Sequence, residues 1–315
     1  MILRYRQKPI PLKKYEILIP RLRPDFPGIR KIHTEQEKRL KGYIGEQSTD
    51  YHTSLLASQF SILQDAGLKI QGKTTQMDTL IVTPHAIFLI ESKNFEGIIT
   101  FDTVLKQLIR DGGQKEKGYR YPITQVELQK VKLKLWLQQH NLAQIPIYPL
   151  VAISDPATVI KVLGDQEVIA KMVFHAEYIP KRIMDIEVRL DGEKFNHHKI
   201  ANMILKECIE YDKDIMAEHG VRVGDLLPGV QCPDCKYIGL ERVYGGWRCD
   251  RCRKKYRNAH EQAIQDYMLL VKPYITNEEC SRWLKINSRH ATKRLLQGSS
   301  RVYFNPYKNR WETKK

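Results

Sequence analysis

Two short apolar runs joined by a turn are the clearest pattern along this chain. Residues 79–82 and 86–90 are apolar or β-branched, and Pro84–His85 lies between the runs and favours a turn. These features predict a β-hairpin. Its charged residues are placed at one end, because Asp78 begins the first strand, and Glu91 and Lys93 follow the second.

The alternation of side chains along a strand brings these charges together. Glu91 and Lys93 are two residues apart, so they point to the same face, and Asp78 lies beside them across the hairpin. Two carboxylates placed this way can hold Mg²⁺ or Mn²⁺, which binds phosphate and activates water. A nearby ammonium group can orient that water or stabilise charge in the transition state. The pattern therefore outlines a phosphodiester-cleaving site, although an isolated Glu-x-Lys pair is also common at solvated strand ends.

A helix before the hairpin can supply a third carboxylate. Thr34–Glu37 has the form of a capping box and predicts the start of a helix. Apolar Leu40, Tyr43 and Ile44 continue the helical pattern, and Glu46 follows within it.

These residues resemble a known family, the nuclease-related domain (NERD) family of the PD-(D/E)xK restriction-endonuclease-like superfamily. The resemblance covers about residues 39–154 and rests on Gly45-Glu46, Gln76-Met77-Asp78, Ile90 to Asn94, Gly97 and Pro122 to Gln125. It implies an α/β fold with an α-β-β-β-α-β core. It also implies that the catalytic residues are Glu46, Asp78, Glu91, Lys93 and Gln125, with Asp78 and Glu91 holding the metal. Met77 departs from the wider superfamily, which often has proline there.

Four cysteines form the second strong motif. Cys232 and Cys235 form one Cys-x-x-Cys pair, Cys249 and Cys252 form another, and thirteen residues separate the pairs. This spacing predicts one tetrahedral, structural zinc ion in a zinc ribbon. Disulfides or a redox dithiol are the alternatives, and the lack of a secretory signal argues against disulfides. The two remaining cysteines are expected to be packed thiols.

The C-terminal residues predict a winged-helix-like domain. Thr276 to Glu279 is a capping box, Ser288 caps a second helix from Arg289 to Gln297, and two short strands follow. An ordinary basic helical hairpin and a protein-docking wing are the alternatives. The residues expected to contact nucleic acid are Arg289, His290, Thr292, Lys293 and Arg301.

The distribution of charge supports a nucleic-acid partner. Residues 253–315 contain 15 Lys and Arg against 5 Asp and Glu, a net charge of +10, and the whole chain has +16. Such a basic segment favours contact with phosphates, with DNA as the expected partner. Residues 1–15 are also basic and could touch nucleic acid. No apolar run approaches a membrane span, so we expect no membrane partner and a cytoplasmic protein.

Together these patterns predict four segments. They are a basic N-terminal extension (1–33) that runs across the surface, a nuclease-related domain (34–225) that ends with a helix from His197 to about Met216, a zinc ribbon (226–257) and a winged-helix-like DNA-binding domain (258–315). The predicted function is a Mg²⁺-dependent nuclease that the ribbon and the basic C-terminal domain hold on DNA. A non-enzymatic DNA-binding or regulatory protein is the alternative, and cleavage of RNA is a third possibility.

Overall fold

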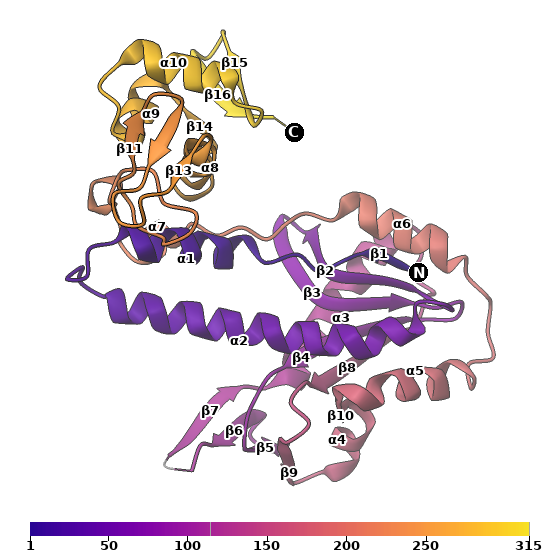
Figure 1. Cartoon of the computed structure of the whole chain (residues 1–315). Coiled ribbons are helices and arrows are strands. Elements are labelled where there is room, and N and C mark those ends of the chain that lie inside the picture. Colours follow the sequence, from indigo (N-terminus) through magenta and orange to yellow (C-terminus); the bar gives the residue numbers. More distant parts are fainter. Residues whose placement is uncertain (114, 315) are drawn as a thin grey trace. The chain divides into compact units, whose positions relative to one another are not determined.

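The computed structural model describes residues 1–113 and 115–314, which form two compact units (Figure 1). The first unit contains Met1–Pro9 and Lys38–Tyr211, and the second contains Ile10–Glu37 and Asp212–Lys315. Each unit is therefore built from two separate stretches of the chain. No helix among the described residues has both the length and the apolar character needed to cross a membrane.

A six-stranded mixed sheet forms the centre of the first unit, in the order β1-β2-β3-β4-β8-β10. β2, β3 and β4 are antiparallel neighbours, whereas β4, β8 and β10 are parallel. The strands are β1 (Ile2–Arg4), β2 (Ser61–Ile70), β3 (Lys73–Val82), β4 (Ile87–Lys93), β8 (Ile147–Ile153) and β10 (Val173–His175). β3 and β4 are the predicted hairpin.

Both faces of this sheet are buried. Leu80 and Leu89 pack on one face with α3 and α6, whereas Ile81 and Phe88 pack on the other face with α5. These helices are α3 (Pro122–Gln139), α5 (Ile179–Glu187) and α6 (His197–Glu207). A sheet covered on both sides needs nearly continuous apolar strands, which is the pattern that marks the hairpin in the sequence.

The chain order α2-β2-β3-β4-α3-β8 confirms the predicted α-β-β-β-α-β core, with α2 spanning Ile29–Thr53. The sequence did not predict a second sheet, in the order β7-β6-β5-β9, whose first three strands are inserted between β4 and α3. The remaining elements of this unit are β5 (Ile98–Asp102), β6 (Gln107–Asp111), β7 (Glu116–Arg120), β9 (Val159–Leu163), α4 (Gln166–Met172), η1 (Ser54–Leu56) and η2 (Ala176–Tyr178).

The second unit has one hydrophobic core, in which Trp247, Trp283 and Trp311 are buried together. Its elements are α1 (Ile10–Arg21), α7 (Ile215–Glu218), η3 (Val223–Asp225), β11 (Glu241–Val243), β12 (Gly246–Arg248), β13 (Lys255–Tyr256), α8 (Ala259–Leu270), β14 (Tyr274–Ile275), α9 (Asn277–Leu284), α10 (Arg289–Gly298), β15 (Val302–Asn305) and β16 (Arg310–Thr313). The ribbon and the winged helix share this core, so the boundary predicted at residue 258 does not separate two cores.

The N-terminal residues are not the extended surface segment that the sequence predicted. β1 joins the central sheet, and α1 buries Leu12, Tyr15 and Leu18, which recur every three residues and so form one helix face. The capping-box prediction at Thr34 is also wrong, because α2 begins at Ile29 and contains Thr34. The Thr34 hydroxyl instead donates a hydrogen bond to the carbonyl oxygen of Arg30, one turn earlier.

The helix predicted from His197 to about Met216 is two helices. α6 ends at Glu207, and α7 begins after Asp214, whose side chain accepts a hydrogen bond from the backbone N–H of Ala217. A helix cap of this kind starts a new helix, which explains why the helical pattern resumes after an interruption.

Candidate active site and metal centres

The five residues predicted to be catalytic all line one cleft in the first unit. The cleft has a volume of about 560 Å³, and α2, β3, β4 and α3 contribute to its walls. Its acidic and amide side chains include Glu46, Asp78, Glu91 and Gln125, and Lys93 lies among them. Residues that are up to 79 positions apart in the sequence are therefore brought to one end of the central sheet.

The register of the hairpin explains how Asp78 and Glu91 meet. Thr79 pairs with Ile90 in the antiparallel strands β3 and β4. One residue further toward this end of the hairpin, β3 therefore presents Asp78 and β4 presents Glu91. The backbone N–H of Ser92 donates a hydrogen bond of 2.8 Å to Asp78 Oδ2, which fixes the carboxylate at the strand end. The single hairpin therefore supplies both carboxylates that the sequence assigned to a metal.

Glu91 is held by three side chains. Its Oε1 accepts hydrogen bonds of 2.5 Å from Lys93 Nζ and from Gln125 Nε2, and its Oε2 accepts one of 2.9 Å from Gln129 Nε2. Gln125 Oε1 in turn accepts a hydrogen bond of 3.0 Å from Lys93 Nζ. Gln129 was missed in the sequence, but it lies four residues after Gln125 and thus one turn further along the same face of α3.

Arg6, in the N-terminal stretch, binds the acidic residues on one side of the cleft. Its guanidinium donates hydrogen bonds to Glu46 Oε2 at 2.7 Å, to Asp50 Oδ2 at 2.6 Å and to the carbonyl oxygen of Asp78 at 2.6 Å. The side chain is only 3% exposed. This arginine therefore fixes α2 to the end of β3. Its guanidinium is engaged there and is not available for the contact with nucleic acid that the sequence left open for residues 1–15. Arg4 is also engaged, through a hydrogen bond to the carbonyl oxygen of Asp65.

Close packing at Gly45 sets the position of Glu46. A Cβ atom at Gly45 would lie 2.4 Å from Asn94 Cβ and 2.7 Å from Ser154 Oγ. Carbon atoms in contact are normally about 3.5–4.0 Å apart. Only glycine therefore lets α2 lie this close to the ends of β4 and β8. Because Glu46 is the next residue of α2, this close packing also positions Glu46 at the cleft.

The electrostatics of the cleft show an excess of negative charge. Burial first and the Asp78 carboxylate second raise the pKa of the Glu46 carboxyl to about 8 and that of Glu91 to about 7. Arg6 and Lys93 act in the opposite direction, but they do not restore ordinary pKa values. A divalent cation would favour the charged forms of these acids, so the donor set suits Mg²⁺ or Mn²⁺.

Comparison with known proteins agrees with this geometry. Residues 41–154 match the family model of the nuclease-related domain, NERD. The predicted resemblance of this segment to the family is thereby confirmed. The matched segment includes all five residues predicted to be catalytic, whereas Arg6 lies outside it. No significant match to a curated protein or to a solved structure was found.

The cleft in the first unit and the cysteine cluster differ as metal sites. Among the described residues, the four cysteines are the only group of three or more His, Cys, Asp or Glu side chains whose ligand atoms all lie within 4.8 Å of one another. Glu46, Asp78 and Glu91 do not form so tight a group. Mg²⁺ commonly takes only one or two carboxylates and keeps several waters, so a Mg²⁺ site does not require three carboxylates as close together as the four cysteines are.

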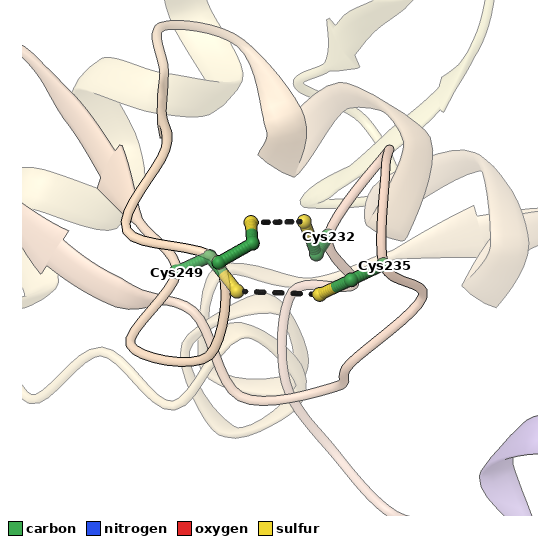
Figure 2. A group of neighbouring side chains, drawn as sticks. Cys232, Cys235 and Cys249 are labelled. Carbon is green, nitrogen blue, oxygen red and sulfur yellow. Dashed lines mark hydrogen bonds between the residues drawn. The ribbon is translucent and has the colours of Figure 1, made fainter.

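The cysteine cluster has the dimensions of a zinc site (Figure 2). The Sγ atoms of Cys232 and Cys252 are 3.7 Å apart, and those of Cys235 and Cys249 are 3.6 Å apart. Four sulfurs at 2.3 Å from one tetrahedral ion would lie about 3.8 Å from each other. The donor set therefore fits one Zn²⁺ with no open position, which is the form of a structural site.

The two knuckles that present these sulfurs repeat the same turn. The N–H of Lys236 donates to the carbonyl oxygen of Cys232, and the N–H of Arg253 donates to that of Cys249. Both donors follow their cysteine by four residues and have a positive φ, 61° and 63°. The sequence shows the two cysteine pairs but not this repeat, because lysine and arginine are not typical of left-handed positions.

The structure changes the predicted nucleic-acid contacts of α10. Arg289, His290, Lys293 and Arg301 are exposed, as expected. Thr292 is fully buried, and its hydroxyl donates to the carbonyl oxygen of Ser288, so the prediction that it faces a groove is wrong. It lies four residues before the buried Leu296, and this helical spacing places both residues on the inner face. Arg294, which was not among the residues predicted to contact nucleic acid, is also exposed.

Proposed function

We propose that this protein is a divalent-metal-dependent nuclease that hydrolyses phosphodiester bonds, with DNA as its expected substrate. The observation that carries the proposal is the network around Glu91, in which Lys93, Gln125 and Gln129 all donate hydrogen bonds to one buried carboxylate. A carboxylate that only completed the fold would not require a lysine beside it at the edge of an open, acidic cleft. The NERD match supports a nuclease-related role.

Each residue of the cleft has a distinct proposed role. Asp78 and Glu91 would hold Mg²⁺ or Mn²⁺, which when bound neutralises phosphate charge and lowers the pKa of water. Lys93, whose side chain is 20% exposed, would position the attacking water or stabilise charge that develops on the phosphate. Glu46 would orient water or share a second ion, and Gln125 would keep Glu91 and Lys93 aligned. Hydrolysis then adds water to phosphorus, breaks one P–O bond and protonates the leaving oxygen.

The second unit would hold the substrate. Its zinc ribbon is proposed to be structural, since four thiolates leave no ligand position for chemistry. Four reduced thiols also fit the cytoplasmic location that we propose, where disulfides are rare. The exposed basic residues of α10 and the wing would contribute contacts with phosphates.

A direct assay tests this function. Purified full-length protein is incubated with single- and double-stranded DNA and RNA in Mg²⁺, in Mn²⁺ and without an added divalent ion. We expect cleavage only with the metal, and we expect Lys93→Ala to lower it by orders of magnitude while binding persists. Binding without cleavage of any substrate would instead favour a non-enzymatic DNA-binding protein, and cleavage confined to RNA would correct the substrate.

A further inference from the structure

A large hollow in the second unit lies where the zinc ribbon and the winged helix meet. It has a volume of about 1080 Å³, and the ribbon, the start of α8, the C-terminal half of α10 and the segment before β15 line it. These elements share one hydrophobic core, so the walls of this cleft are fixed relative to one another. We call it the ribbon–wing cleft.

The ribbon–wing cleft is strongly basic. Five exposed cationic side chains line it, and they are Lys236, Lys255, Arg257, Arg294 and Arg301. Glu261 is the single acidic residue of the lining, and its carboxylate accepts a hydrogen bond of 2.6 Å from the Ser299 hydroxyl.

Within the described part of the chain, none of these five cations forms a salt bridge, and Asp234, the acid near Lys236, is already paired with Lys254. Other basic residues of the same unit do have one, since Arg248 binds Glu241 and Arg310 binds Glu312, each at 2.6 Å. The cleft therefore concentrates unneutralised positive charge in a concave site, which is the electrostatic condition for binding a polyanion.

The cleft is distinct from the helix face that the sequence analysis assigned to DNA. Arg294, Leu295 and Gly298 of α10 line it, whereas Arg289 and Lys293 do not. α10 thus presents two charged sectors. One sector contains Arg294 and faces the cleft, where Lys255 and Arg257 of the ribbon and Arg301 before the wing add further positive charge. The other sector contains Arg289 and Lys293.

The geometry points to the ribbon–wing cleft as the site that binds the phosphate backbone of a nucleic-acid strand. This inference rests on the proposed nuclease function and specifies where its substrate is held. A nucleic-acid backbone presents regularly spaced negative charges that a row of lysines and arginines can neutralise.

The test measures binding by the full-length chain without cleavage. All variants carry Glu91→Gln, no divalent ion is added, and no chelator is used, so that zinc is retained. Fluorescence anisotropy follows labelled single-stranded and duplex DNA of about 20 nucleotides per strand at several salt concentrations. The cleft variant combines Arg257→Gln, Arg294→Gln and Arg301→Gln.

Two further variants serve as controls. Lys194→Gln, Lys199→Gln and Lys206→Gln remove the same charge from exposed positions of the first unit. A second control, Arg289→Gln with Lys293→Gln, removes the other sector of α10. Zinc content must stay at one per chain in every variant, which shows that the ribbon is folded.

We expect the cleft variant to bind about a hundredfold more weakly at 0.1 M salt. The slope of log K against log salt should fall by about 2 on single strands or about 3 on duplex, because three phosphate contacts are lost. The first-unit control should bind nearly as wild type. A preference between the two DNA probes identifies whether the cleft takes a free strand or one backbone of a duplex.

Three results would overturn the inference. They are unchanged binding by the cleft variant, an equal loss in the first-unit control, and a larger loss in the Arg289/Lys293 variant than in the cleft variant, which would favour the other sector. A wild-type chain that binds through the cleft but cuts nothing would refute the nuclease and leave this inference standing.

Discussion

Two glycines in one helix provide a sharp test of how the NERD domain positions Glu46. Gly42 and Gly45 both lie within α2, so alanine at either position gains the same helix propensity, about 1 kcal/mol. A Cβ at Gly42 has no neighbour within 4 Å, whereas a Cβ at Gly45 meets Asn94 Cβ at 2.4 Å. Asn94 cannot turn aside easily, because its Nδ2 donates a hydrogen bond to the carbonyl oxygen of Lys41.

The two substitutions should therefore have opposite effects. Gly42→Ala should stabilise the first unit by about 1 kcal/mol. Gly45→Ala must displace α2 by about 1 Å to reach normal contact distances, and such overpacking costs about 1–3 kcal/mol. Because the propensity gain is common to both, the difference in free energy of unfolding between the variants measures the contact alone. We expect about 1–3 kcal/mol.

Hydrogen exchange measured by mass spectrometry suits this comparison, because peptides from the central sheet report the first unit separately from the second. Protection should rise in Gly42→Ala and fall in Gly45→Ala. The cleavage rate of Gly45→Ala should fall as well, since Glu46 moves with the helix. Equal stabilisation by both alanines would show that α2 does not pack against Asn94 and would refute this account of the site.

Three further predictions concern other parts of the chain. Arg6→Met should destabilise the first unit by about 3–5 kcal/mol, because it leaves the buried Asp50 and the partly buried Glu46 without their cation; unchanged exchange protection in the central sheet would contradict the pairing. Cys249→Ser should lose the zinc found by elemental analysis, a contribution on the order of 10 kcal/mol, and α8 to β16 should lose protection together because they share the ribbon's core. Retention of protection in α8 would show that the zinc ribbon and the elements α8 to β16 fold independently. Thr292→Arg should cost about 3 kcal/mol or more by burying a charge, whereas a groove-facing residue would tolerate arginine and strengthen DNA binding.

Local patterns in the sequence predicted the parts of the fold that local physics determines. The hairpin β3–β4 follows from two apolar runs and a turn, and the start of α9 follows from the capping box at Thr276, which is formed in the structure. The spacing of the cysteines likewise predicted their clustering. In each case the residues that interact are close in the sequence, so their pattern carries the information.

Long-range partners could not be predicted in this way. Arg6 lies 40 residues before Glu46, and nothing in a basic N-terminal stretch marks one arginine as buried. The helix α1 was missed because its prolines suggested an extended chain, although Pro11 lies in the first turn, where proline is tolerated. Thr292 shows a different error, since its polarity suggested exposure while its helical position relative to Leu296 decided its burial.

Whether Glu91 takes part in cleavage is decided by comparing the cleavage rate of the wild-type protein with that of Glu91→Gln. The two are purified identically and assayed with Mg²⁺ on the substrate that the wild type cuts. The substitution keeps the size of the side chain but removes the charge that would hold the metal, so we predict a rate lower by orders of magnitude with nucleic-acid binding retained. Equal rates would contradict this role of Glu91, because the cleavage would then come from a contaminating nuclease or from a site other than the first-unit cleft.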